Sequence, residues 1–265
     1  MPIDSKGSFC YNYRWYFIGG ETLVDIHSHV APSLDDGADS IEESLEMLEF
    51  AAKSGTTHLA VTPHYLNKSQ CRFNVRKSDI ENAFSLLCEK KEKAGISIEL
   101  FLGAEHFGVT DILRYAEEGE LLPINKTRYI LVEFDFSDDI RRVSFVLKTL
   151  SNFGLVPIVA HPERYDFLQS DPSGVFSLLE KGCLLQVNKG SPLGKYGLGA
   201  QALSKWLLDN HLVHFVASDC HSPFKRTPEM RPAHEMLTYR LGAAYADRLF
   251  FENPMRVIKD EPITF

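Results

Sequence analysis

Seven short apolar runs, separated by stretches of helical periodicity, constrain the fold of this chain more than any other feature. Apolar runs of this length that alternate with helices predict a parallel sheet covered on both faces. Seven such units without a break favour a closed or nearly closed barrel over an open sheet. The runs cover residues 23–27, 58–62, 97–105, 128–134, 155–161, 183–187 and 214–218.

The helix with the clearest sequence signals is expected to begin near Ser40. Ser40 and Glu43 have the spacing of a capping box, and Gly55 supplies a stop signal. No repeat, low-complexity tract or linker interrupts the chain after this point. We therefore expect one α/β domain over residues 23–265, preceded by an N-terminal extension over residues 1–22 whose aromatic side chains pack on the domain.

The composition is that of an ordinary globular protein, with 44% hydrophobic and 24% charged residues. No apolar run approaches the roughly 18 residues of a membrane span, and the N-terminus lacks the basic start and continuous apolar centre of a signal peptide. Five cysteines without paired spacing suit a reducing compartment better than a disulfide framework. The sequence thus predicts a cytoplasmic protein that is not inserted in a membrane.

The formal net charge of -8 at pH 7 argues against general binding of nucleic acid. It does not exclude a local site for an anion. Metal ions or a few arginines would have to attract such a substrate.

Side chains that bind metals stand at or just beyond the ends of most of the apolar runs. In a barrel of this type, active sites form at the carboxyl ends of the strands, where the loops converge. One polar residue at a strand end proves little, but six of metal-binding type are hard to obtain by chance. These residues are His27, His64, Glu105, Glu133, His161 and Asp219.

The spacing of two histidines strengthens the metal hypothesis. Side chains two residues apart on an extended backbone point the same way, so His27 and His29 can reach one ion. The nearby Asp35 and Asp36 lie in a turn that can fold back toward the same ion. Alternatively, both carboxylates cap the helix that begins near Ser40. We expect Asp36 rather than Asp35 to be a ligand.

The two glutamates also favour bound cations. Glu105 and Glu133 could each form an ion pair at a strand end, but two carboxylates inside one barrel mouth repel each other unless cations lie between them. His161 precedes Pro162, Glu163 and Arg164, which suits a loop over a site. The remaining histidines are expected to be structural: His58, His106, His211, His214 and His234.

The order DIHSH, DDG, TPH, GAE, VEF, AHPERY and SDxH resembles the polymerase-and-histidinol-phosphatase (PHP) superfamily. Within it, the chain is similar to the manganese-dependent protein-tyrosine phosphatases of bacterial capsule and exopolysaccharide gene clusters. The resemblance runs from Leu23 to the C-terminus through NKGSPLG at 188–194 and ENP at 252–254. The chain differs from the family at Ser33, Cys220 and Ser222, where glycine, alanine and asparagine are common, and in its N-terminal extension.

This resemblance implies a distorted (β/α)7 TIM-like barrel that holds three divalent ions, with manganese expected and iron or zinc as alternatives. His27, His29, Glu105 and Asp219 would bind the first ion. Glu105 would bridge to the second, completed by Glu133 and His161, and Asp36, His64 and His221 would bind the third. Arg164 and Arg226 would grip the phosphate and, with His221 and Asp36, form the catalytic set.

The resemblance also implies a substrate and a partner. The substrate would be a phosphotyrosine protein, and the expected partner is a bacterial tyrosine kinase of capsule assembly. Three alternatives stay open at this point. The first is another PHP phosphoesterase that acts on histidinol phosphate or a nucleotide, and the second is a metal-binding module without activity. The third, an amidohydrolase, would usually carry a bridging lysine where this chain has Glu105 and Glu133.

A competing pattern lies within residues 216–227, where Cys220 and Arg226 have the spacing of a cysteine-nucleophile tyrosine phosphatase. Such an enzyme needs a loop whose backbone N–H groups all point at the phosphate, and glycines usually permit that geometry. Residues 221–225 contain no glycine and include a proline, which has no N–H. We therefore expect Cys220 to be a small filler between two metal ligands.

Overall fold

The computed structural model describes residues 9–11, 14–16, 22–67, 69–72 and 74–263, and in the first two ranges only the backbone. All seven predicted runs contain a strand. These strands are β3 (Leu23–Asp25), β4 (Thr56–Val61), β6 (Glu99–Leu102), β8 (Tyr129–Glu133), β9 (Val156–Ala160), β10 (Leu184–Asn188) and β11 (Phe215–Ala217). Two short strands, β5 (His64–Tyr65) and β7 (Glu105–Phe107), were not predicted as separate elements.

The strands form two parallel sheets, with the order β3-β4-β6 in one and β11-β10-β9-β8-β7-β5 in the other. The chain bends from the first sheet into the second at Gly103, where a Cβ atom would lie 3.2 Å from the side chains of Thr62 and Ile124. A larger residue would therefore crowd this bend. Beyond it, His64 of β5 lies opposite Glu105 of β7, which brings two predicted ligands together.

The opposite edges of the two sheets also meet. Ser28, just after β3, forms a parallel bridge with Cys220, just after β11, and His29 N donates to the Cys220 carbonyl at 2.9 Å. The parallel α/β class is thus confirmed. Because the parallel ladders among the described residues form two separate sheets, closure into a complete barrel stays a prediction.

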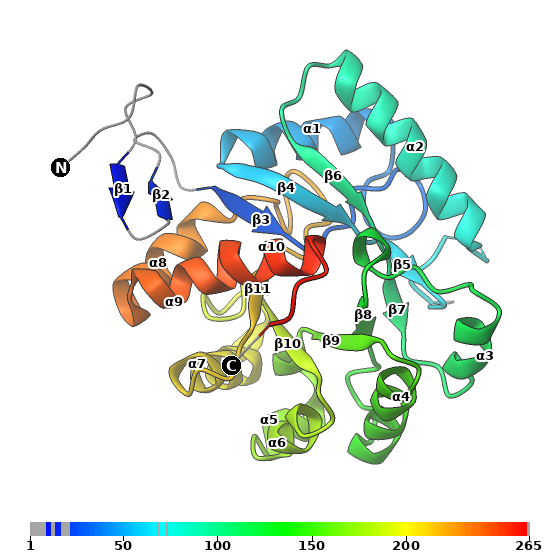
Figure 1. Ribbon diagram of the computed structural model, residues 1–265, viewed down its shortest axis with the longest axis vertical. Helices are drawn as coiled ribbons and strands as arrows, with labels where there is room; N and C mark the ends of the chain where they lie inside the picture. Colours follow the sequence, from blue (N-terminus) through cyan, green and yellow to red (C-terminus); the bar gives the residue numbers. More distant parts are fainter. Residues whose placement is uncertain (1–8, 12–13, 17–21, 68, 73, 264–265) are drawn as a thin grey trace.

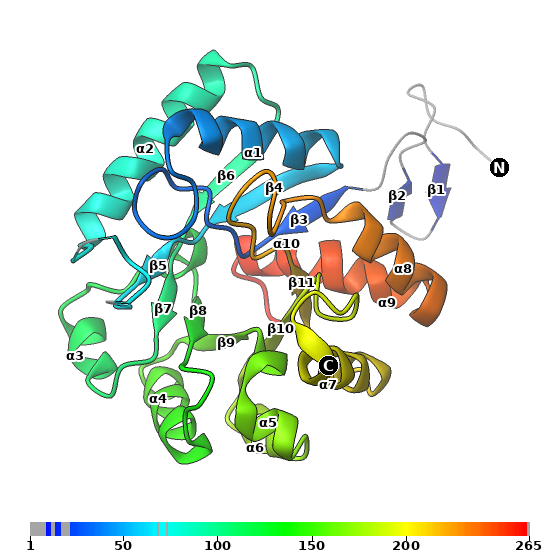
Figure 2. The same ribbon diagram turned by 180° about the vertical axis from the view of Figure 1, so that it is seen from behind.

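Helices surround the strands (Figures 1 and 2). Their bounds are α1 (Ile41–Lys53), α2 (Lys77–Lys93), α3 (Ile112–Glu117), α4 (Ile140–Asn152), α5 (Asp166–Ser170), α6 (Gly174–Leu179), α7 (Gly197–Asp209), α8 (Arg231–Leu241), α9 (Ala243–Asp247) and α10 (Asn253–Ile258). Short turns of 3₁₀ or π type cover Ile124–Lys126, Pro162–Arg164 and Arg248–Glu252. Within the described part of the chain, no helix combines the length and apolarity needed to cross a membrane.

The predicted helix start is present in α1. Ser40 Oγ accepts a hydrogen bond from Glu43 N at 3.2 Å, while the Glu43 carboxylate accepts from Asp39 N at 2.8 Å instead of from Ser40. The cap is therefore one residue wider than the predicted capping box. At Gly37, just before this cap, an added Cβ atom would lie 2.2 Å from the His29 carbonyl oxygen. Only glycine therefore lets the turn that contains Asp35 and Asp36 lie against His29.

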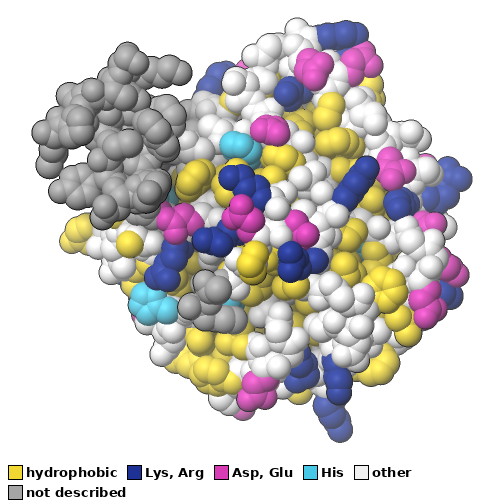
Figure 3. Space-filling view, viewed as in Figure 1, with side chains coloured by type: hydrophobic (Ala, Val, Ile, Leu, Met, Phe, Trp, Pro, Cys, Tyr) yellow, Lys and Arg dark blue, Asp and Glu magenta, His cyan; other side chains and the backbone are white. Residues whose placement is uncertain are grey.

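Buried apolar side chains cover both faces of the strands, as expected for parallel sheets. One cluster, which includes Val24, Leu131 and Phe215, is shared by strands of both sheets. Another places strands β8 to β11 against helices such as α4, α7 and α8. On the face in Figure 3, basic and acidic side chains are interspersed.

The N-terminal extension is described only in part. β1 (Phe9–Tyr11) and β2 (Arg14–Tyr16) pair as antiparallel strands. The predicted packing of its aromatic side chains lies outside the described residues. The division into residues 1–22 and 23–265 stays a prediction.

Candidate metal centre

The side chains predicted to bind metal meet in one cluster. Five of them lie in the loops after β3 and after β11, which are side by side in Figure 2. The other four lie in β5, β7 and β8 and just after β9. All are buried except Asp36, whose side chain is 48% exposed. The set is His27, His29, Asp36, His64, Glu105, Glu133, His161, Asp219 and His221.

The first predicted group is compact. The Nε2 atoms of His27 and His29 lie 3.2 Å apart, and they lie 3.2 and 3.3 Å from the two oxygens of Glu105. Each of these nitrogens is also 3.5 Å from Asp219 Oδ1. Two imidazole nitrogens and two carboxylates thus face one point. Together they form a suitable donor set for a divalent transition metal.

The second predicted group shares Glu105 with the first. His161 Nε2 lies 3.0 Å from Glu105 Oε1 and 3.9 Å from Glu133 Oε2. His64, predicted for the third group alone, also reaches this one, because its Nδ1 is 3.0 Å from Glu105 Oε2 and 2.9 Å from Glu133 Oε1. Glu105 therefore lies between two groups of donors.

The third predicted group forms around Asp36. Its Oδ1 lies 3.4 Å from His64 Nε2 and 3.3 Å from His221 Nε2. His29 also belongs to this group, since ligand atoms of all four residues lie within 4.8 Å of one another. The two nitrogens of His64 thus face different groups, which the sequence pattern did not indicate.

Several buried polar atoms of the donor cluster lack hydrogen-bond partners, which favours bound cations. Among the described residues, both His64 nitrogens, Glu105 Oε2 and Asp219 Oδ1 are buried without a hydrogen-bond partner. Leaving such an atom unpaired costs about 1–3 kcal/mol, and more when it is charged. These atoms all face neighbouring ligand-type groups. Metal coordination would satisfy them together.

Two carboxylates of the cluster, Asp219 and Glu105, favour the ionised form. Burial alone would raise the pKa of Asp219 and Glu105. The Arg226 guanidinium and the neighbouring histidines together outweigh this effect at Asp219, and His27, His64 and His161 together do so at Glu105, so both pKa values lie well below the ordinary range. A concentration of buried negative charge is what a divalent cation stabilises.

Asp35 holds two of the predicted ligands in place, a role that the sequence analysis did not assign. Its Oδ2 accepts from His29 Nδ1 and from the backbone N–H of His64, both at 2.8 Å, and its Oδ1 accepts from Gly37 N at 2.9 Å. Asp35 is buried and does not cap α1, since Ser40 does so. By holding the proton on Nδ1, it leaves Nε2 of His29 free to bind a metal.

Gln186 has the corresponding role for His27. Its Oε1 lies 2.7 Å from His27 Nδ1, and its Nε2 donates to Asn188 Oδ1 at 2.9 Å. Asn188 in turn donates to Asp219. A signal for Gln186 was present in the sequence, because it is a polar residue within the apolar run 183–187.

Replacement of Asp35 by asparagine is expected to lower metal affinity about 10- to 100-fold, the usual cost of losing such a supporting group. The amide keeps the volume but removes the charge that fixes the His29 ring. Metal titration of the purified variant measures the change. Asp39→Asn, which alters an exposed carboxylate in the same loop, should bind metal like the unaltered protein. Equal affinity in both variants would contradict this role.

The two predicted phosphate-binding arginines converge on Asp219 at the edge of the cluster. Arg164 lies over the ring of Phe136 at 4.2 Å and over Tyr196 at 5.1 Å, and its Nη1 is 3.9 Å from Asp219 Oδ2. Arg226 pairs with the same carboxylate and has Nη1 2.9 Å from His221 Nε2. Both side chains are partly exposed, so they can meet a ligand from solvent.

Three residues of this region adopt left-handed backbone conformations. His161, Asp219 and Arg226 have φ angles of 34°, 49° and 49°. Residues other than glycine rarely adopt this left-handed region, and they do so mostly where the surrounding structure enforces it at functional sites. Two predicted ligands and one predicted phosphate-binding residue are therefore held in strained conformations.

Cys220 lacks the properties of a nucleophile. It is fully buried, and burial raises the pKa of its thiol to about 12, so the thiol stays protonated near neutral pH. The N–H groups of the following loop bond within the loop, His221 N to the Arg226 carbonyl at 2.9 Å and Lys225 N to Ser222 Oγ at 2.9 Å. They do not form an anion cradle, and the cysteine-phosphatase pattern is coincidental.

His106 is a satisfied core histidine, as predicted. Its Nδ1 lies 3.1 Å from the Leu131 carbonyl, and its Nε2 accepts from Leu122 N at 3.1 Å. Burial lowers the pKa of His106 to about 4, so the ring is neutral. Its position next to Glu105 therefore does not make it a ligand.

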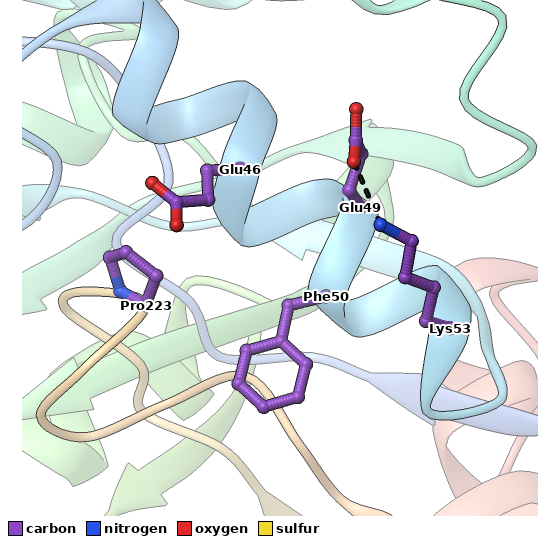
Figure 4. Close-up of a pocket in the computed structure, with 5 residues that line it drawn as sticks. All are labelled: Glu46, Glu49, Phe50, Lys53 and Pro223. Carbon is purple, nitrogen blue, oxygen red and sulfur yellow. Dashed lines mark hydrogen bonds and ion pairs between the residues drawn. The ribbon is translucent and has the colours of Figure 1, made fainter.

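A hollow of about 410 Å³ lies outside the metal cluster, between α1 and the loop after β11 (Figure 4). Its lining consists of Glu46, Glu49, Phe50, Lys53 and Pro223, and Glu49 pairs with Lys53 at 2.9 Å. None of the predicted site residues lines it. We therefore assign the candidate active site to the donor cluster and not to this hollow.

Comparisons with known proteins point to one family. The profile of the family described as capsular polysaccharide synthesis, CpsB/CapC, matches residues 23–259. Tyrosine-protein phosphatase CpsB of Streptococcus pneumoniae is 30% identical over 246 residues, which cover 91% of this chain and all of the relative. Tyrosine-protein phosphatase YwqE of Bacillus subtilis is 31% identical over 221 residues, 83% of this chain and 86% of that protein.

A solved structure agrees in fold. It is described as belonging to YwqE from Bacillus subtilis and CpsB from Streptococcus pneumoniae, unique metal-dependent tyrosine phosphatases. The superposition has a TM-score of 0.84 at 30% identity and covers 91% of this chain and 96% of the other. The similarity therefore extends over the strands and loops that carry the donor cluster.

Proposed function

Because this chain belongs to the CpsB/CapC family of capsular polysaccharide synthesis, we propose that it is a metal-dependent protein-tyrosine phosphatase. Relatives that bear that activity in their names cover 91% and 83% of it. The observation that carries the proposal is the donor cluster with two arginines at its edge. This arrangement combines ligands for cations with two guanidinium groups that can bind a phosphate.

The proposed assignment uses three divalent ions, with manganese first and iron or zinc as alternatives. His27, His29, Glu105 and Asp219 would hold one ion, and Glu105, Glu133 and His161 a second. Asp36, His64 and His221 would hold the third. When bound, such ions lower the pKa of water toward neutrality and offset the charge of a phosphate.

Charge explains how an acidic chain could attract phosphate. Three divalent ions carry about +6 and the four carboxylates of the set about -4, which leaves roughly +2. Arg164 and Arg226 add a further two positive charges. A phosphate dianion would thus meet a positive site, despite the net charge of -8 on the whole chain.

The arginines are proposed to hold the phosphate oxygens while the ester bond breaks. Their forked donors suit a tetrahedral oxyanion, and both guanidinium groups already lie against one carboxylate, Asp219. Phenolate is a good enough leaving group that tyrosine phosphate needs less acid assistance than an alkyl phosphate. His221 and Asp36, at the exposed side of the cluster, are proposed to complete the catalytic set.

The biological setting is also a proposal. The family description refers to capsular polysaccharide synthesis, so we propose a tyrosine kinase of capsule or exopolysaccharide assembly as the phosphoprotein partner. We place the reaction in the cytoplasm. We further propose that the two sheets close into a distorted (β/α)7 barrel over residues 23–265.

Activity on a substrate panel tests the proposed function. The protein with its metal should hydrolyse a phosphotyrosine peptide much faster than histidinol phosphate or bis(p-nitrophenyl) phosphate. Cys220→Ser should retain activity within about threefold, because its thiol is buried and protonated. Preference for histidinol phosphate would indicate another phosphoesterase, and no turnover of any substrate would indicate a binding module.

Replacing either arginine separates phosphate binding from metal binding. Arg164→Ala and Arg226→Ala are each expected to lower kcat/KM by about 10²- to 10³-fold, the usual loss when one donor to a developing oxyanion is removed. Metal content should not change, because neither side chain belongs to the donor set. Steady-state kinetics and elemental analysis of the same samples measure both. Loss of metal from either variant would refute this assignment.

A further inference from the structure

The segment Asn188–Ser191, which begins at the last residue of β10, contacts the loop that carries Arg164. Glu163 Oε1 accepts from the backbone N–H of Asn188 at 2.9 Å and from Ser191 Oγ at 2.6 Å. Glu163 is fully buried and precedes Arg164 within the short turn Pro162–Arg164. Because adjacent residues in a tight turn move together, these hydrogen bonds of Glu163 also hold the backbone of Arg164 in position.

The same segment contacts the loop that carries Arg226 through a buried lysine. Lys189 Nζ donates to the carbonyls of Thr227 and Glu229, which follow Arg226 in the chain. Its backbone N–H donates to the Ala217 carbonyl at 2.9 Å. A buried ammonium costs free energy unless it is well bonded, so this lysine strongly favours the observed path of the loop.

A third contact joins the segment to the point where the arginines meet. Asn188 donates from Nδ2 to the Asp219 carboxylate, with which Arg226 pairs and near which Arg164 lies. The two arginines come from loops far apart in the sequence, after β9 and after β11. Their common support is thus a turn after β10, the strand between those two in the sheet.

We propose that Asn188–Ser191 sets the relative position of the two arginines, with Ser191 acting through Arg164 and Lys189 acting through Arg226. Both are positioning residues, since Lys189 is 8% exposed, Ser191 is buried, and both donate to protein oxygens. The inference rests on the proposed function. A displacement of about 1 Å in a positioning group can cost about 100-fold in rate, so even a small shift of either loop should be measurable.

Double-mutant cycles test the two halves of the proposal separately. Lys189→Met should lower kcat/KM for a phosphotyrosine peptide about tenfold, and about equally in the Arg164→Ala background. In the Arg226→Ala background the same change should cost less than about twofold. Ser191→Ala should lower kcat/KM about fivefold and show the reverse pattern, losing its effect only when Arg164 is absent.

Three controls keep the result interpretable. Lys181→Met removes a lysine that follows α6. Its Nζ donates to the carbonyl of Ser177 at 2.6 Å and to the Ser177 hydroxyl at 3.0 Å. Because these contacts lie away from the site, the replacement should leave kcat/KM unchanged. Metal content and thermal midpoint are measured for every variant. Lys189→Arg enters the same cycle, so that the proposal stays testable if Lys189→Met does not fold.

The outcomes distinguish this inference from the proposed function. Equal losses in both arginine backgrounds, or loss of metal from the Lys189 variants, would show general structural support and overturn the inference. Unchanged kinetics in both the Lys189 and Ser191 variants would also overturn it. If the unaltered protein with its metal did not hydrolyse the phosphotyrosine peptide, the proposed function would fail instead.

Discussion

Removal of the divalent ions is expected to lower kcat/KM for a phosphotyrosine peptide by at least about 1,000-fold, and returning them should restore it. Metal ions contribute several kcal/mol of charge stabilisation to reactions of this kind, and each 1.36 kcal/mol changes the rate about tenfold. Without them, the ionised carboxylates of Glu105 and Asp219 would face a phosphate bound at the proposed site. Like charges in a buried site then exclude the substrate.

Chelation followed by dialysis and return of single metals measures this effect. Manganese, iron and zinc are added separately to portions of one stripped sample, which also identifies the metal that supports the fastest turnover. Cys220→Ser is stripped and reloaded beside the unaltered protein, and both should lose and regain activity together. A stripped sample that keeps its full rate would overturn the metal mechanism.

The positions of the ligands were largely predictable because each follows a feature of local sequence. Parallel strands end at a common edge, so residues placed at the ends of apolar runs were expected to converge, and His27, Glu105 and His161 do so. The exceptions lie at bends. The chain turns at Gly103, so Glu105 begins a new strand instead of ending the old one, yet its side chain still reaches the cluster.

The residues that hold the ligands were not predictable in the same way. Asp35 orients His29 through a turn whose path depends on Gly37 and on the start of α1, and no spacing rule connects them. Lys189 reaches carbonyls about forty residues away, a contact that depends on how two loops pack. Long side chains in loops carry little periodic signal, so their partners become visible only in three dimensions. Closure into a barrel would depend on edge contacts such as that of Ser28 with Cys220, which are equally non-local.

Glu105→Gln is expected to be the most damaging single replacement of a ligand. The carboxylate of Glu105 lies within 3.3 Å of nitrogens from His27, His29, His64 and His161, so it contacts two donor groups at once. Glutamine keeps the volume but presents an amide that can coordinate through one oxygen only. We expect a loss of activity of about 1,000-fold or more, because the charge and one of the two carboxylate oxygens that face both donor groups would be lost together.

The matched variant is Glu133→Gln. This buried glutamate contacts His64 and His161 of the second group and also accepts from Asn67 at 2.8 Å. Elemental analysis should find more than one ion per chain lost from Glu105→Gln and at most one from Glu133→Gln, while circular dichroism shows both folded. An equal loss from the two variants would mean that Glu105 serves a single ion. The carboxylate of Glu105 joins two donor groups into one centre. Comparing Glu105→Gln with Glu133→Gln therefore tests the geometry on which the proposed chemistry depends.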